Sequence, residues 1–257
     1  MSDEITVYWA PWIDGEYEGR EKQRGVSQWV YEEPQSVYRD LLAKKSDQKI
    51  TKNFFQCPAT RDALHNVYMI KCPFNTTSEV LLKETGEVER VEQNWAQHSP
   101  DLLSQCRVEL SHAPSKTNEL LLVVEYTYVF YCDEPLQMRM TAPWFHQAPH
   151  MQYGAAVPGA FDIGRWIRPV NFEMNLWPGE TKMNLEEGEP MGYLEFGTDK
   201  KINFQRFETT SKFKSLVSDS ILVRNKAFAP SLLKRYRIFD RSPIKKILLK
   251  EIKDNLL

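Results

Sequence analysis

Residues 170–207 read VNFEMNLWPGETKMNLEEGEPMGYLEFGTDKKINFQRF, and this stretch decides the fold. In its first seven residues, apolar side chains alternate strictly with Asn171, Glu173 and Asn175, which is the pattern of a half-buried strand. The turns WPGE and EEGE separate this strand from TKMNL, PMGYLEF and KINFQRF, which we predict to be three further strands. Consecutive strands with short turns predict a β-meander, as in sandwiches, barrels and clip-like folds.

Most of the chain on the N-terminal side also favours strands. The longest apolar run, ELLLVVEYTYVFY (119–131), is rich in Val, Tyr and Phe and predicts a central strand. We predict other strands at ITVYWAPW, NFFQCPA, NVYMIKCPF, CRVEL and LQMRMTAPWF, and a hairpin in SEVLLKETGEVERVEQ. QSVYRDLLAKKSD has helical spacing and predicts a short helix.

The chain changes character after Thr209. SKFKSLVSDSILV, PSLLKRYRIF and IKKILLKEIKDNLL have helical spacing, and Ser242 precedes Pro243 as a helix-capping residue. Residues 212–257 contain twelve Lys and Arg against four Asp and Glu, a net charge of +8 that leaves −10 for the rest. We therefore predict a β-rich domain over residues 1–211 and a basic helical extension over residues 212–257.

The composition is that of an ordinary globular protein. The 257 residues are 42% hydrophobic and 26% charged, with a net charge of −2, which is enough chain to bury a proper core. No apolar run approaches the roughly 20 residues of a membrane helix, and MSDEITVYW lacks a signal-peptide pattern. We therefore expect a cytoplasmic protein with no membrane partner. The four cysteines form no CxxC pair, so we expect buried thiols.

The segment VPGAFDIGRWIRPVNFEMNLWPGETKMNLEEGEPMGYLEF (157–196) resembles part of the dUTPase and dCTP-deaminase superfamily. The likeness consists of a Gly–apolar–Asp turn, a strand that contains Glu, and a Gly-containing turn into the next strand, at Gly159, Phe161, Asp162, Glu173, Gly188 and Gly192. It extends over residues 119–207 and implies a β-clip core, which the superfamily usually assembles into trimers. The flanks resemble uncharacterised proteins of marine tailed phages, which implies the cytoplasm of a host cell.

The resemblance implies catalytic roles for two carboxylates. In the diphosphatases the turn Asp, here Asp162, orients the water that attacks the α-phosphate, whereas in the deaminases the strand Glu, here Glu173, moves protons. The phosphate-binding loop of the superfamily is missing. The corresponding stretch, RMTAPWFHQAPHM, has Arg139, but Pro143 and Pro149 remove backbone donors from it.

The candidate site residues also have structural interpretations. Asp162 could cap its own turn, and Glu173 could be a solvated residue on the polar face of its strand. Trp166, Arg139 and Arg165 are candidate ligand-binding residues. Trp166 could equally belong to the core or to a subunit contact, as could Trp144 and Trp177.

No metal site and no cofactor are predicted. His146 and His150 have the spacing of helical metal ligands, but Pro149 between them disfavours a regular helix. Mg²⁺ would be expected only for a nucleotide diphosphatase. The chain contains no P-loop, GxGxxG or GxSxG motif, which disfavours the common nucleotide-loop and hydrolase mechanisms.

Three functions remain open. The first is a non-catalytic binding or structural relative of the dUTPase-like fold, expected to be a homo-oligomer whose partner is a nucleotide or a phage or host protein. The second is a divergent nucleotide hydrolase or deaminase with Asp162 or Glu173 as general base. The third is a nucleic-acid-associated protein that binds through residues 212–257, although these amphipathic helices could instead dock on the body.

Overall fold

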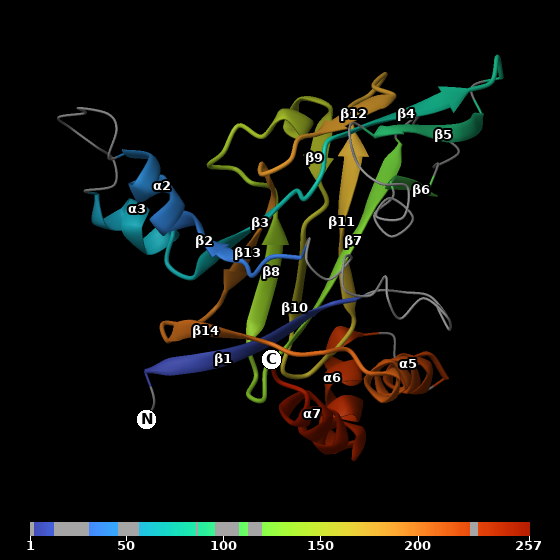
Figure 1. Ribbon diagram of the computed structural model, residues 1–257. Helices are drawn as coiled ribbons and strands as arrows, with labels where there is room; N and C mark the ends of the chain where they lie inside the picture. Colours follow the sequence, from blue (N-terminus) through green and yellow to red (C-terminus); the bar gives the residue numbers. More distant parts are fainter. Residues whose placement is uncertain are drawn as a thin grey trace.

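Three β-sheets with helices at two ends make up the fold (Figure 1). The computed structural model describes residues 3–12, 31–45, 57–85, 87–95, 108–112, 120–226 and 231–257. Sheet A has the strand order β14-β1-β7-β11-β9, with β6 also paired to β7. Sheet B has the order β10-β8-β13-β3-β2, and sheet C the order β12-β4-β5.

Sheet A consists of β1 (Glu4–Pro11), β6 (Val108–His112), β7 (Leu121–Tyr131), β9 (Gly154–Ala156), β11 (Pro169–Leu176) and β14 (Lys201–Arg206). Sheet B consists of β2 (Gln35–Ser36), β3 (Val67–Lys71), β8 (Gln137–Thr141), β10 (Gly159–Asp162) and β13 (Pro190–Phe196). Sheet C consists of β4 (Thr76–Leu82), β5 (Val88–Trp95) and β12 (Lys182–Leu185).

The main hydrophobic core joins all three sheets. It includes Val7 of β1, Ile70 of β3, Val80 of β4 and Met138 of β8. In β11, residues alternate between half-buried and buried, as the strict apolar alternation of VNFEMNL predicted. The prediction of a mainly β fold with C-terminal helices is confirmed.

The predicted β-meander is wrong, because the strands of residues 170–207 do not pair with one another. β11 pairs with β7 and β9, β12 with β4, β13 with β3 and β8, and β14 with β1. Strand β13 shows the physical reason. Six of its seven residues are buried, so it needs a neighbour on each edge and cover on both faces, which a hairpin with β12 could not supply.

Strand β1 lies between two strands from distant parts of the chain. It pairs antiparallel with β7 and parallel with β14. The end of the chain adds to the same region: the Leu257 N–H donates to the Arg206 carbonyl at 3.0 Å, and Phe207 forms an antiparallel bridge with Leu256. Sheet A is therefore assembled from both halves of the sequence.

The C-terminal helices pack on the body of the protein (Figure 1). They are α5 (Ser211–Lys226), α6 (Leu232–Arg241) and α7 (Ile244–Asp254). Their apolar side chains form a second core with β1 and β7, to which they contribute Phe213, Val217, Phe239, Leu248 and Ile252. Helix α6 is capped by Ser231, whose side chain accepts the Lys234 N–H. Because the apolar faces turn inward, many of the basic side chains remain on the outside.

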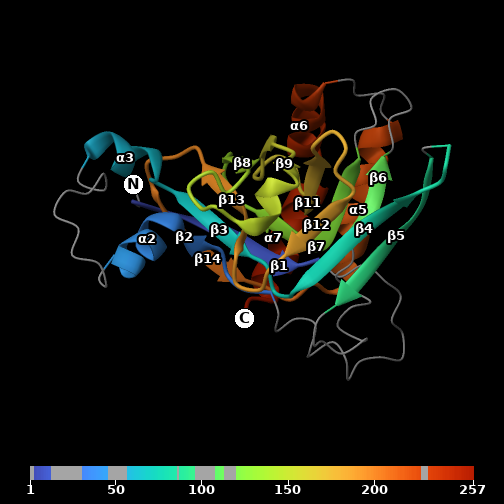
Figure 2. The ribbon, with the colours of Figure 1, turned by 90° about the horizontal axis from the view of Figure 1, so that it is seen from above.

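Two short helices lie at the other end of the fold, α2 (Val37–Lys45) and α3 (Pro58–Ala63) (Figures 1 and 2). Helix α2 confirms the prediction for QSVYRDLLAKKSD. The strand predicted at NFFQCPA is wrong where it can be compared, because Pro58 begins α3, a position that suits proline. The rest of that predicted strand lies outside the described residues.

The predicted β4–β5 hairpin is confirmed, and Figure 2 shows it projecting from the body on the side opposite α2 and α3. Cys72 and Cys132 are buried as predicted, but Cys57 is exposed because it precedes the surface helix α3. Cys106 lies outside the described residues. Among the described helices, none has the length and apolar character needed to cross a membrane.

Candidate functional site

The carboxylate of Asp162 closes a turn at the end of β10. Its Oδ1 atom accepts the N–H groups of Leu136 and Gly164, each at 3.0 Å. The backbone N–H of Asp162 donates to the hydroxyl of Tyr236 on α6 at 2.7 Å. Asp162 is buried, so these contacts satisfy polar groups that lie away from bulk water. The turn therefore joins three separate segments of the chain.

Arg165 and Trp166, which follow this turn, also contact α6. The Nε atom of Arg165 donates to Asp240 at 2.8 Å. Burial alone would raise the pKa of Asp240, but hydrogen bonds from Arg165 and Lys245 hold it below its usual value. Trp166 packs on Phe161 of β10 at 6.0 Å between ring centroids. The guanidinium groups of Arg168 and Arg235 lie over the Trp166 ring, at 5.8 and 5.5 Å from its centroid.

Glu173 and Arg139 lie elsewhere. Glu173 is a half-buried residue of β11 in sheet A, where its Cα pairs with that of Val123. Arg139 is an exposed residue of β8 in sheet B, and its guanidinium lies 3.8 Å from the carboxylate of Glu195. Asp162 belongs to sheet B, so the two predicted catalytic carboxylates lie on different sheets. Of the predicted site residues, the fold brings together Asp162, Arg165 and Trp166.

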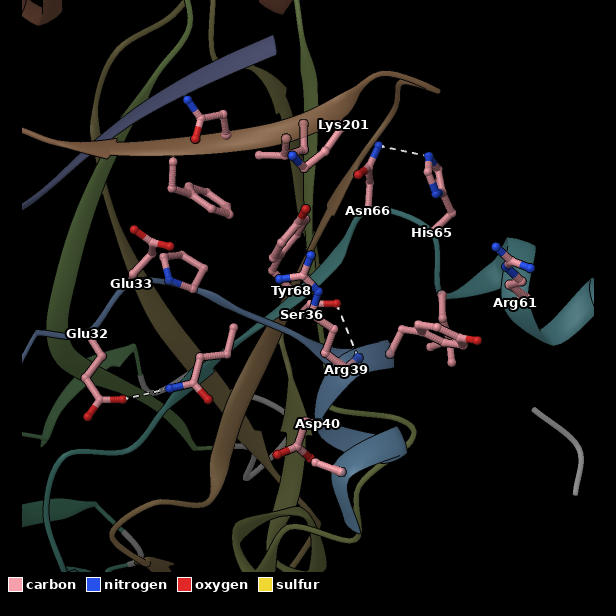
Figure 3. Close-up of a pocket in the computed structure, with 18 residues that line it drawn as sticks. Glu32, Glu33, Ser36, Arg39, Asp40, Arg61, His65, Asn66, Tyr68 and Lys201 are labelled. Atoms are coloured by element: carbon pink, nitrogen blue, oxygen red, sulfur yellow. Dashed lines mark hydrogen bonds between the residues drawn. The ribbon is translucent and has the colours of Figure 1, made fainter. Parts of the chain in front are cut away.

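A pocket of about 1070 Å³ lies at a different place, where β14, the edge strand of sheet A, faces β2, the edge strand of sheet B. Figure 3 shows its walls. Helices α2 and α3 and the segment before β2 complete the lining, in which most side chains are polar or charged. A volume at the upper end of the range for small-molecule sites leaves room for a ligand larger than a single small metabolite.

Most of the charged groups in the pocket already have partners. Lys201 pairs with Glu4 at 2.6 Å, and Glu32 accepts a hydrogen bond from Gln35 at 3.1 Å. By contrast, Arg39 and Arg61 make no ion pair with a carboxylate anywhere in the described part of the chain. The two guanidinium groups are therefore the cations in this pocket that can neutralise a bound anion.

The pKa shifts in the pocket favour neutral forms of two groups. Burial raises the pKa of Glu33. Burial also raises the pKa of Tyr68, which nearby Arg39 lowers and Glu33 raises further.

One wall of the pocket is held by a chain of three side chains. The Asp40 carboxylate, which lines the pocket, lies 3.2 Å from Nε2 of His146. The Nδ1 atom of the same ring shares a short hydrogen bond with the hydroxyl of Tyr193. Tyr193 is fully buried in β13, and burial raises its pKa. The chain thus anchors α2 to sheet B through the loop that follows β8.

Asn66 positions the turn beneath α3. Its side-chain amide donates to the carbonyl oxygens of Thr198 and Lys200, each at 2.7 Å. Its φ of 53° lies in the left-handed region, which Asn tolerates better than most residues. This contact joins the α3–β3 turn to the segment that leads into β14, so it fixes the distance between two walls of the pocket.

Comparison with other proteins does not identify a family for the chain. A scan against protein-family models, a search of curated proteins and a search of solved structures all found no match. The site must therefore be interpreted from its own chemistry.

The pocket has the composition of a binding site. Asp40 and His146 bond each other, and Tyr193 lies behind them, away from solvent. Within the described residues, no group of three or more His, Cys, Asp and Glu is placed to hold a metal ion. His150, which sequence spacing placed with His146, is instead buried in the 3₁₀ turn η2 (Pro149–Gln152). The pocket offers cations, hydroxyls and amides to a ligand.

None of the residues predicted from the sequence to form a site lines this pocket. Its residues come from two helices, three strands, the α3–β3 turn and the segment before β2, and they form no sequence motif. One signal was present in the sequence: the polar run EEPQS stands directly before a helix whose first turns contain Arg39 and Asp40. A cluster of charges at a helix entry is common at surfaces, so this signal alone could not distinguish a pocket from a solvated face.

Proposed function

We propose that the chain is a non-catalytic binding protein, and that its ligand occupies the pocket between β14 and β2. The observation that carries the proposal is the use of the Asp162 carboxylate. Its Oδ1 accepts two backbone N–H groups and it is buried, so it is committed to holding a turn. A general base must lie within reach of the proton that it removes, and burial keeps this carboxylate away from solvent. The pocket, in contrast, presents Arg39 and Arg61 to a ligand.

The direct test combines binding with turnover. The purified chain is screened by thermal shift against deoxynucleotides, ribonucleotides and short peptides, since a ligand that binds only the native state raises the melting temperature. We expect shifts that disappear in Arg39→Ala and persist in Arg90→Ala, an exposed arginine of the β4–β5 hairpin outside the pocket. We also expect no hydrolysis or deamination of any deoxynucleotide. Turnover that is lost in Asp162→Asn or Glu173→Gln would establish the enzyme alternative instead.

The basic outer surface of α6 and α7 supports a second candidate, an association with nucleic acid. Lys234, Arg237 and Lys246 are exposed there and make no ion pair with any described carboxylate. Such cations bind phosphates without sequence preference and with strong salt dependence. The test is binding of single- and double-stranded DNA at increasing salt. Replacement of the three residues by Glu should abolish binding, whereas Lys83→Glu in the exposed β4–β5 hairpin should not.

We further propose that residues 119–207 are a divergent β-clip core of phage origin. Support comes from the order of features, because a tight Asp turn precedes a strand with a half-buried Glu, and a Gly turn with φ +82° precedes the next long strand. Light scattering on the purified chain gives a test: a trimer supports this relationship, and a monomer counts against both it and the expected homo-oligomer.

A further inference from the structure

We propose that the ligand of this pocket is an extended acidic peptide segment of a partner protein, which adds to the open edge of β14 as an antiparallel strand. This inference rests on the proposed function, since it names the ligand class of the same pocket. It is carried by the hydrogen-bonding direction of β14, by the aromatic wall beside that strand, and by the charges of Arg39 and Arg61.

One edge of β14 lines the pocket. At one end Lys201 donates its N–H to the Asp3 carbonyl, and at the other Phe207 donates to the Trp9 carbonyl. In a parallel pair, alternate residues direct both of their backbone groups to the same neighbour. Odd-numbered residues of β14 therefore face β1, and Ile202 and Phe204 direct their N–H and C=O groups the opposite way. No described strand pairs with β14 on that side.

The same edge already accepts an antiparallel segment at its far end. The N–H of Leu257 donates to the carbonyl of Arg206, and the N–H of Glu208 donates to the carbonyl of Asn255. These bonds show that the even-numbered side of β14 is geometrically able to pair. A peptide that follows the direction of residues 255–257 would next meet Phe204 and then Ile202, both of which line the pocket.

Side-chain chemistry beside the edge predicts what such a peptide contains. A residue directly opposite Phe204 places its side chain on the same face as the Phe204 ring, which packs on Tyr68 at 4.9 Å between centroids. That position favours an apolar or aromatic residue. Arg39 lies close enough to Tyr68 to influence its hydroxyl, and Figure 3 shows the two side chains together in the pocket. Arg39 and Arg61 therefore favour acidic residues in the same segment.

The binding mode is strand addition, in which backbone hydrogen bonds supply affinity and alternate side chains supply specificity. The probe is a yeast-displayed library of random octapeptides, selected on the intact chain, followed by synthesis of the enriched peptide. We expect enriched peptides that alternate apolar with other residues and include Asp or Glu. Methylating the backbone nitrogens one at a time should reduce affinity at least tenfold at every second residue and little in between.

Substitutions in the protein test its own contacts with the bound peptide. Phe204→Pro removes the outward N–H at an edge position, which a sheet can tolerate, and should weaken the peptide at least tenfold. Gln205→Ala, an exposed change on the same strand, should leave affinity unchanged. Arg39→Ala should also weaken the peptide, whereas Arg90→Ala in the exposed β4–β5 hairpin should not. If Phe204→Pro fails to fold, the two-residue periodicity of the backbone-methylation effect still tests strand addition.

The outcomes separate the two proposals. An enriched acidic peptide with two-residue periodicity and dependence on Arg39 supports both. Small anions that bind through Arg39, with no enriched peptide or no periodicity, overturn strand addition and leave the pocket as a small-molecule site. Absence of any shift or enrichment overturns both.

Discussion

At the scale of single residues, Asp162 is used for structure. Replacing it with Ala leaves the N–H groups of Leu136 and Gly164 without their acceptor in a buried turn, so we expect a loss of about 2 kcal/mol in the free energy of unfolding. Asp162→Asn retains an oxygen at Oδ1 and should lose less than half as much. Glu173→Ala, at a half-buried strand position, should change stability by about 0.5 kcal/mol or less. Urea denaturation measures all three.

The two glycines that flank Asp162 should differ sharply. A Cβ atom at Gly164 would lie 2.0 Å from the backbone oxygen of Glu134, whereas at Gly159 it would meet nothing within 4 Å. Gly164→Ala should therefore cost about 3 kcal/mol or prevent folding, because the backbone must move. Gly159→Ala is the matched control and should be nearly neutral. Equal stabilities of the two variants would show that the 162–166 turn is less constrained than its contacts imply.

Burial of His150 makes the protein sensitive to acid. Burial lowers the pKa of His150 from 6.5 to about 4, and a backbone hydrogen bond with Met191 opposes this only in part. Between these pH values the unfolded chain binds a proton that the native chain does not, so stability is full above about pH 6.5 and falls as the pH decreases toward 4. The largest loss in the free energy of unfolding that this one histidine can cause is about 3 kcal/mol.

The test is a comparison of unfolding free energies at pH 7 and pH 4.5. His150→Leu should lose less stability on acidification than the unaltered chain. The exposed His65→Leu variant controls for the loss of an imidazole in general. An unchanged difference between the two pH values in His150→Leu would contradict the assignment.

At the scale of elements, the C-terminal helices are held by their apolar stripe. Leu248 of α7 is fully buried, whereas the adjacent Ile247 is 44% exposed. Leu248→Ala should therefore cost about 3 kcal/mol, since it deletes buried methyl groups and leaves a cavity. Ile247→Ala, on the same helix with a side chain of similar size, should cost less than about 1 kcal/mol. Denaturation midpoints of the two variants measure the difference.

Sequence patterns located elements well, because each strand has its own alternation of burial. VNFEMNL became β11, and ELLLVVEYTYVFY became β7. Pairing was predicted poorly, because the partner of a strand depends on surfaces that lie far away in sequence. The sequence PMGYLEF, for example, contains no feature that predicts the pairing of β13 with β3 and β8.

The candidate site was harder to predict for the same reason. Asp162, Arg165 and Trp166 are close in sequence and were found together, although their contacts with α6 were not foreseen. The pocket depends on contacts such as the one from Asn66 to Lys200, which spans 134 positions. Side chains that have no local pattern and meet only after folding leave no periodic or motif signal.

At the scale of the whole molecule, the basic tail belongs to the fold. Removing residues 211–257 would expose Tyr8, Trp12, Val129 and Ile167, which form one buried cluster with the helices. A chain that ends at Thr210 should therefore aggregate or lose cooperative unfolding. Size-exclusion chromatography and thermal denaturation check this. A monomeric truncated chain with unchanged melting temperature would show that residues 1–210 fold alone.

The position of β1 between β7 and β14 has a consequence for synthesis. Glu4 and Lys201, which form an ion pair across β1 and β14, are 197 positions apart. On the ribosome, β1 emerges long before β14 has been synthesised. The edge of β1 that will pair with β14 is therefore unpaired during most of synthesis. Long-range pairing of this kind slows folding. We therefore expect the β14-facing edge of β1 to stay open in a newly made chain until residues 201–206 have been synthesised.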